Sequence, residues 1–114
     1  MIHVTIKRLA KDNSHITSYV VEGHAYYDDP GKDIVCSAVS AVAVGTVNSI
    51  EALTGIIPIH EMETGFLDIT IPEIASSNQD KVNQVQLILE SMVVMLRSIE
   101  ETYGAYITIE TLIE

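Results

Sequence analysis

The sequence has 114 residues, of which 47% are hydrophobic and 19% charged, a balance typical of one globular domain spanning 1–114. Sixteen acidic residues against six basic ones give a net charge of −10, so direct nucleic-acid binding is not expected. The charge would attract a basic peptide, although it could equally serve solubility alone. The single cysteine, Cys36, excludes an internal disulfide and fits a reducing cytoplasm.

Two short strands open the chain. Apolar and polar residues alternate over 1–8. Residues 16–22 return as a second strand, and the polar residues 11–13 between the two predict a hairpin turn. His3 and His15 belong to this hairpin and are expected to face solvent. We expect no signal peptide, because the first strand lacks the long apolar core of a leader sequence.

An uncharged stretch predicts the first helix, from Ile34 to about Leu53. This helix is expected to be heavily buried, because its sequence is apolar almost all round. Gly55 is a natural stop for it. The uncharged part, 34–50, is shorter than the ~20 residues that a membrane span needs, so we expect no membrane partner.

The second half of the chain predicts a hairpin and another helix. Residues 57–63 and 66–71 flank a Thr-Gly turn, and Ser-Asn-Gln-Asp at 77–80 is a capping-box pattern that begins the second helix. Met92 and Met95 are expected to be core filler. Apolar residues recur at steps of three and four, which predicts one buried stripe: Val82, Val85, Leu89, Met92, Leu96, Ile99 and Tyr103.

A last alternating strand over 106–113 completes the order β-β-α-β-β-α-β. This order predicts an α+β domain with a mostly antiparallel sheet and two helices packed on one face. The other face carries Thr5, Thr70 and Thr108. This open face, or an edge strand, could form a homodimer.

The cysteine lies where a helix would activate it. Asp33 is a natural N-cap, so Cys36 takes the third helical position, among backbone N–H groups and the positive end of the helix dipole, which favour a thiolate. His24 ends the second strand, and the loop 25–32 could return it to the helix start as a base. From spacing alone, a small buried cysteine and an unrelated surface histidine are the commoner explanation.

Other chemistries lack their residues. There is no C-x-x-C and no histidine pair at helical spacing, so no metal or other cofactor is expected. Thiol–disulfide exchange needs a second cysteine, and Ser40 lacks the G-x-S-x-G sequence of a nucleophile elbow. His60 is a rival base, but the neighbouring Glu61 and Glu63 indicate a solvated face. Cys36 with His24 is the chemistry that remains.

Gly23-His24-Ala25, followed after a short loop by Asp33-Ile34-Val35-Cys36-Ser37-Ala38, resembles the signature of the ribosomal-processing cysteine protease (Prp) family. The resemblance extends over essentially the whole chain. It implies a cytoplasmic, homodimeric cysteine endopeptidase that removes a short N-terminal extension from a large-subunit ribosomal protein. The resemblance makes Cys36 the nucleophile and His24 the base. Supporting signature positions are Gly23, Asp33 and Ser40.

The loop between base and nucleophile reads Tyr26-Tyr27-Asp28-Asp29, and such loops vary within the family. We expect it to be mobile without substrate and to close over a bound peptide, with its tyrosines beside apolar side chains and its aspartates facing basic ones. The substrate is then a basic, extended N-terminal peptide.

Three further roles are open at the helix start. Backbone N–H groups, including that of Cys36, are expected to stabilise the oxyanion. Asp33 could orient His24 or only cap the helix. Ser40 could orient a group beneath the thiol or bond to the Cys36 carbonyl.

Two functions without catalysis are also consistent with the residues. One is a ribosome-assembly or protein-binding module that uses the open sheet face. The other is a structural homodimer with an inert, buried cysteine. Both predict that the thiol has no unusual reactivity.

Overall fold

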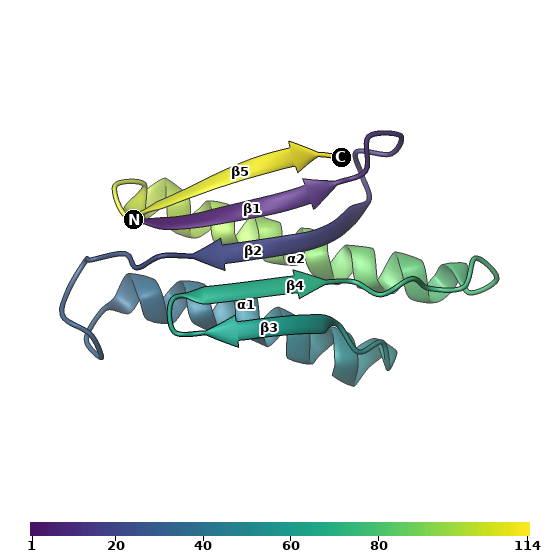
Figure 1. Cartoon of the computed structure of the whole chain (residues 1–114), viewed down its shortest axis with the longest axis horizontal. Helices are drawn as coiled ribbons and strands as arrows, with labels where there is room; N and C mark the ends of the chain where they lie inside the picture. Colours follow the sequence, from purple (N-terminus) through teal and green to yellow (C-terminus); the bar gives the residue numbers. More distant parts are fainter.

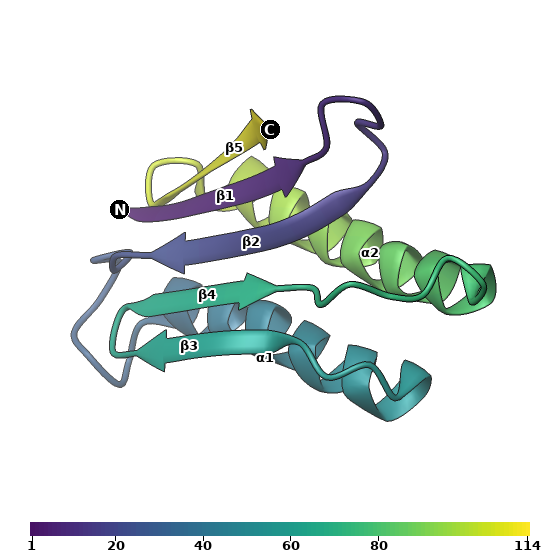
Figure 2. The ribbon, with the colours of Figure 1, turned by 45° about the vertical axis from the view of Figure 1, so that its right-hand side comes forward.

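The computed structural model describes all 114 residues as one five-stranded sheet with two helices. Both helices cover the same face of the sheet (Figures 1 and 2). The strands lie in the order β3-β4-β2-β1-β5; only the β1–β5 pair is parallel. The predicted α+β architecture is confirmed. The elements are β1 (Ile2–Arg8), β2 (Ile16–Glu22), α1 (Ile34–Thr54), β3 (Ile59–Glu63), β4 (Phe66–Thr70), α2 (Gln79–Tyr103) and β5 (Ile107–Ile113).

The core lies between the sheet and the two helices. The alternation in β1 buries every second side chain, with Ile6 opposite Tyr19 of β2 and Val4 beside Ile109 of β5. Each large side chain buried in this way contributes about 1.5–3 kcal/mol of apolar transfer free energy. The Tyr19 hydroxyl donates to the Ala43 carbonyl at 2.8 Å. The helices contribute one stripe each: Val35, Val39, Ala43, Thr46, Ile50 and Thr54 of α1, and Val85, Leu89, Met92 and Leu96 of α2.

The helices are less buried than expected. In α1 only the stripe that faces the sheet and α2 is buried, whereas Leu53 is 74% exposed and Ile34 53% exposed. Met95 was expected in the core but is 43% exposed, because it lies just outside the α2 stripe.

Helix α1 has 21 residues and is, by length and composition, apolar enough to cross a membrane. The expectation that this helix is too short for a membrane span is therefore wrong. Here its buried stripe packs on the sheet instead.

The predicted capping box of α2 is wrong. The N-cap is Asn78, one residue later than the box requires, and its side chain makes no capping hydrogen bond. Lys81 therefore takes the position that the box assigns to an acid. Its ammonium donates to the Thr54 carbonyl and ties the start of α2 to the end of α1.

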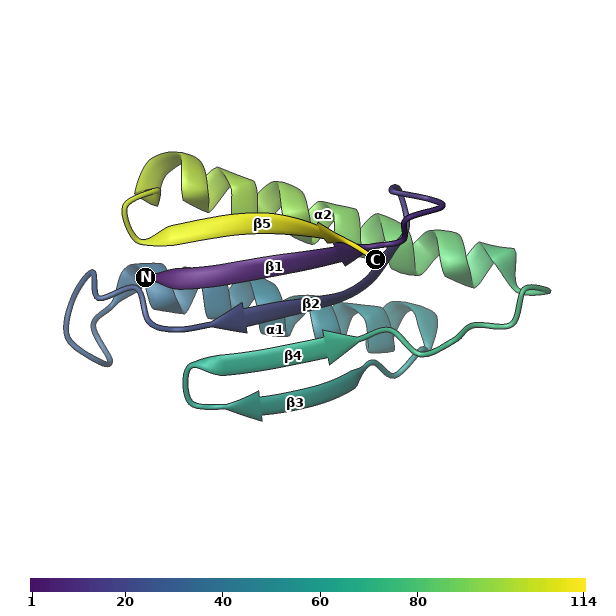
Figure 3. The same ribbon diagram turned by 45° about the horizontal axis from the view of Figure 1, so that its top comes forward.

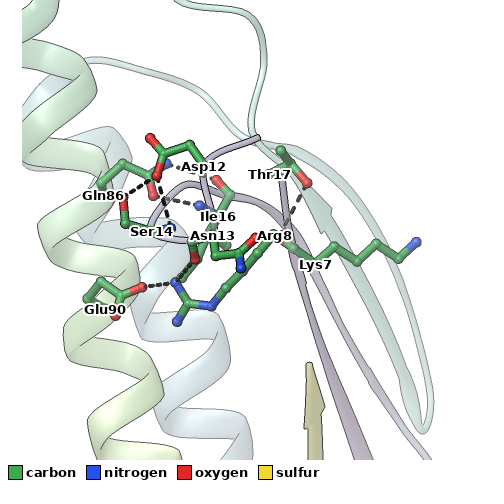
Figure 4. A network of polar contacts seen from close by, with 9 residues as sticks. All are labelled: Lys7, Arg8, Asp12, Asn13, Ser14, Ile16, Thr17, Gln86 and Glu90. Atoms are coloured by element: carbon green, nitrogen blue, oxygen red, sulfur yellow. Dashed lines mark hydrogen bonds and ion pairs between the residues drawn. The ribbon is translucent and has the colours of Figure 1, made fainter. Parts of the chain in front are cut away.

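A polar clamp joins the β1–β2 turn to α2 (Figure 4). The Gln86 amide accepts from the Ile16 N–H and donates to the Ile16 carbonyl, each at 2.8 Å, as a neighbouring strand would. Arg8 forms an ion pair with Glu90 at 2.5 Å. This clamp holds one end of the sheet against α2 and leaves the other end to the β2–α1 loop (Figure 3).

Candidate active site

Three segments meet at the end of the sheet opposite the polar clamp: the loop after β2, the start of α1 and the β3–β4 turn (Figure 1). Cys36 and His24 both line two cavities at this end. The fold therefore brings together two residues that the sequence separates by the whole loop.

Cys36 is partly buried and lies in the first turn of α1. Its Sγ accepts a hydrogen bond from the Ala25 N–H at 3.3 Å. Ala25 is only 3% exposed, so water competes little for this donor. An N–H donor and a helix N-terminus both stabilise negative charge on sulfur. Cys36 also lines two cavities, unlike a cysteine that only fills the core.

Asp33 caps α1 as predicted. One carboxylate oxygen accepts from the N–H groups of Val35 and Cys36, both at 3.0 Å. The other accepts from Tyr27 at 3.0 Å and Asp28 at 3.3 Å. Both oxygens therefore accept from backbone donors, and the carboxylate links the loop to the first turn of the helix.

The cap has two consequences for the site. Desolvation raises the pKa of Asp33, but the hydrogen bonds from Cys36, Asp28 and Tyr27 outweigh it and hold the pKa below its usual value. The Cys36 N–H is already donated to Asp33, so an oxyanion would compete with that carboxylate for it, and the oxyanion role of this N–H stays a prediction. The donor beside the sulfur is that of Ala25.

His24 is exposed and lies between the loop and the β3–β4 turn. Its ring meets Tyr26 edge-on, with centroids 5.9 Å apart. Tyr26 adopts a left-handed backbone conformation, φ 55°, which is uncommon for a residue with a side chain and recurs at functional sites. A methyl group on Gly65 would lie 2.7 Å from His24 Nε2.

The first of the two environments around Cys36 is apolar. This apolar cavity has a volume of about 350 Å³ and contains Ser40 and Met62. Gly23 lies at its edge with φ 91°, and a Cβ there would approach the Met1 carbonyl oxygen to 2.5 Å. The complete lining is Ile2, Val21, Gly23, His24, Cys36, Val39, Ser40, Ala43, Val44, Met62, Glu63, Gly65, Phe66 and Leu67.

The second environment is lined mainly by polar residues. This polar cavity has a volume of about 470 Å³, and it includes Tyr26, Asp28 and Ser37 but no lysine or arginine. Asp29 lines neither cavity. The complete lining is His24, Tyr26, Asp28, Pro30, Gly31, Asp33, Cys36, Ser37 and Thr64.

Tyr27 differs from the role expected for it. Its ring packs edge-on against Tyr103 and Tyr106, with centroids 5.7 and 5.1 Å apart, and it lines neither cavity. Together with the Asp33 bonds, these contacts anchor the middle of the loop. His60, the rival base, is exposed on β3 and also lines neither cavity.

Sequence reasoning missed Ala25 as the donor to sulfur and Gly65 as the neighbour of His24. The Gly-His-Ala sequence contains Ala25 but does not indicate that its N–H donates to the sulfur. The Thr-Gly turn was visible only as a hairpin signal. No group of three or more His, Cys, Asp or Glu side chains is arranged to hold a metal ion.

The sequence matches known proteins along most of its length. The family described as cysteine protease Prp matches residues 1–108. The ribosomal processing cysteine protease Prp of Bacillus subtilis is 33% identical over 113 residues, 97% of each chain. Its namesake in Staphylococcus aureus is 34% identical over 101 residues, 89% of this chain and 92% of its own.

Solved structures share the fold. The S. aureus ribosomal processing protease Prp, in complex with a covalently linked product peptide, superposes with a TM-score of 0.84 at 34% identity, covering 98% of this chain and all of that one. A structure of the S. aureus protease with a substrate peptide gives 0.78 at 32% identity, covering 98% and 100%. A Streptococcus mutans protein gives 0.82 at 26% identity, covering 100% and 96%.

Proposed function

The chain belongs to the cysteine protease Prp family of ribosomal processing enzymes and is a cysteine peptidase, and from this premise we propose that Cys36 and His24 cleave a short N-terminal extension from a large-subunit ribosomal protein. One observation carries the assignment of residues. Cys36 and His24 line the same two cavities, and the residue after His24 donates its N–H to the Cys36 sulfur.

The reaction follows from this arrangement. His24 takes the proton of the Cys36 thiol, and the thiolate attacks the peptide carbonyl to form a carbon–sulfur bond. The proton passes from His24 to the leaving amine as the carbon–nitrogen bond breaks. Water, deprotonated by His24, then hydrolyses the thioester, releasing the peptide's new carboxylate and restoring the thiol.

The two cavities support a peptide that crosses the Cys36 sulfur. Apolar substrate side chains fit the apolar cavity, and basic ones fit the polar cavity beside Asp28. Glu63 lines the apolar cavity and Asp28 lines the polar cavity, and no lysine or arginine lines either one. This charge distribution favours a positively charged partner. The S. aureus protease has been crystallised with substrate and product peptides, which supports an extended peptide here.

We also propose that the protein works in the cytoplasm as a homodimer. The open sheet face or an edge strand was the expected contact. Large exposed apolar side chains lie on edge strand β3, where Ile59 is 61% and Met62 52% exposed, and also on the helices. Leu53 is 74% exposed, Leu87 72% and Val94 65%. The molar mass in solution, measured by light scattering, tests the dimer.

The substrate assignment is tested by digestion. A large-subunit ribosomal protein that carries its N-terminal extension is incubated with the enzyme, and its intact mass is measured. The expected result is the loss of one N-terminal peptide, with no change in the same protein lacking the extension. An unchanged mass, from enzyme whose Cys36 reacts with a thiol reagent, would overturn the substrate assignment and leave the thiol chemistry standing.

A further inference from the structure

Gly65, in the β3–β4 turn, lies directly against the imidazole of His24. A Cβ built on Gly65 would be 2.7 Å from Nε2, 3.0 Å from Cε1 and 3.4 Å from Cδ2 of His24. Real Cβ atoms do not come so close, so the ring occupies space that exists only because residue 65 has no side chain. The contact joins the end of β2 to a turn more than forty residues further along the chain.

The backbone fixes this turn relative to His24. The Gly23 N–H donates to the Gly65 carbonyl at 2.9 Å, immediately before His24. Tyr26 also meets the ring edge-on. The imidazole therefore contacts Tyr26 as well as the Gly65 backbone, and both contacts come from segments that also line the cavities around Cys36.

We propose that Gly65 is a positioning residue for the base: its missing side chain lets the His24 imidazole lie against the β3–β4 turn, beside the cavities that His24 shares with Cys36. The inference rests on the proposed roles of His24 and Cys36. Because the His24 side chain is exposed, a methyl group at 65 would turn the ring away without disrupting the core. In the variant, the His24 ring no longer lies where it can take the proton of the Cys36 thiol, and proton transfer requires that geometry.

Two variants and one control test this. Gly65→Ala adds the methyl group, and Gly65→Asn adds a side chain that tolerates a left-handed backbone. Gly55→Ala is the matched control, since Gly55 has φ 77° against 73° for Gly65, and its Cβ would meet only the Lys81 Nζ at 3.5 Å. Gly55→Ala therefore carries the same backbone strain far from His24.

In steady-state cleavage of a peptide that spans the scissile bond, both Gly65 variants should lose at least about tenfold in kcat, a fraction of the ~10²–10⁴ that general-base catalysis contributes. Their KM should stay within about twofold of wild type. Gly55→Ala should match wild type in both constants. Gly65 variants that behave like Gly55→Ala would overturn the proposal.

A second background separates positioning from a general structural effect. If Gly65 acts through His24, adding Gly65→Ala to His24→Ala should cause no further loss. In Cys36→Ser protein, Gly65→Ala should also move the NMR resonances of the His24 ring, while those of His60 stay fixed. A further loss in the double variant, or an unmoved His24 ring, contradicts the proposal. Full activity of His24→Ala would instead overturn the assignment of the base.

Discussion

The backbone N–H of Ala25 donates to the Sγ of Cys36 at 3.3 Å. Ala25 directly follows His24, so one short segment carries both the proposed base and a hydrogen-bond donor to the proposed nucleophile. The donor is fixed by backbone and is nearly inaccessible to solvent. Negative charge on the sulfur is thus supported from the loop as well as from the helix N-terminus.

Removing the proposed base should slow catalysis without unfolding the protein. His24→Ala should lower kcat by about 10²–10⁴, the usual contribution of general-base catalysis. A slow reaction should remain, because the helix terminus and the Ala25 N–H still act on the sulfur. His60→Ala is the matched control and should cleave a peptide at the wild-type rate. If His60→Ala were inactive and His24→Ala active, the base would be His60.

Acid should weaken the hydrogen bonds by which the Asp33 carboxylate links the loop to the helix. The folded pKa of Asp33 lies below its ordinary value, so its contribution to stability is present above the unfolded pKa of about 3.9. That contribution is lost as pH falls through the folded pKa. The melting temperature of wild type should therefore fall more steeply than that of Asp33→Asn between about pH 6 and pH 2.

Asp33→Ala provides the comparison at neutral pH. It should melt below Asp33→Asn, because asparagine can still accept a bond from the first turn of the helix. The role given to the carboxylate would be contradicted if the melting temperatures of wild type and Asp33→Asn changed equally with pH over the whole range.

The loop should be mobile only in part. The N–H groups of Tyr27 and Asp28 are held by Asp33, so their hydrogen exchange in Cys36→Ser protein should be slow with or without a peptide. The N–H groups of Tyr26 and Gly31, which border the polar cavity, should become protected only when peptide is bound. Equal protection of all four in both samples would exclude a closing loop.

Tyr19→Phe tests the polar bond inside the core. The hydroxyl is buried and donates to the Ala43 carbonyl, and burial raises the pKa of Tyr19 above its usual range. Losing this bond should cost about 1 kcal/mol in the free energy of unfolding, measured in urea. An unchanged free energy of unfolding would mean that the Ala43 carbonyl finds another donor.

Local sequence patterns predicted the parts of the fold that depend on neighbours in the chain. The alternation in β1, the stripe of α2 and the Asp33 cap were visible because each is set by spacing within one element. The capping box failed because a shift of one residue changes which side chain reaches the helix start. Met95 was misplaced because the periodicity of α2 shows which residues lie near its buried stripe but not how wide a face of the helix is covered.

The site was predictable only in its main residues. The Cys36–His24 pair was inferred from a family resemblance, since spacing favoured a buried cysteine. The contact of Gly65 with His24 and the bond from Ala25 to sulfur join segments distant in sequence. Such contacts follow from how β4 pairs with β2 and how the loop folds back, which no local pattern encodes.

The assignment of Cys36 as the nucleophile is tested by the activity of the Cys36→Ser protein on its substrate. The substitution changes little volume, so the melting temperature should stay within a few degrees of wild type, which corresponds to less than about 1 kcal/mol. A serine hydroxyl is not ionised by a helix terminus and one N–H donor, so intact-mass analysis should find uncleaved substrate after the time in which wild type cleaves all of it. Cleavage by Cys36→Ser near the wild-type rate would show that Cys36 is not the nucleophile.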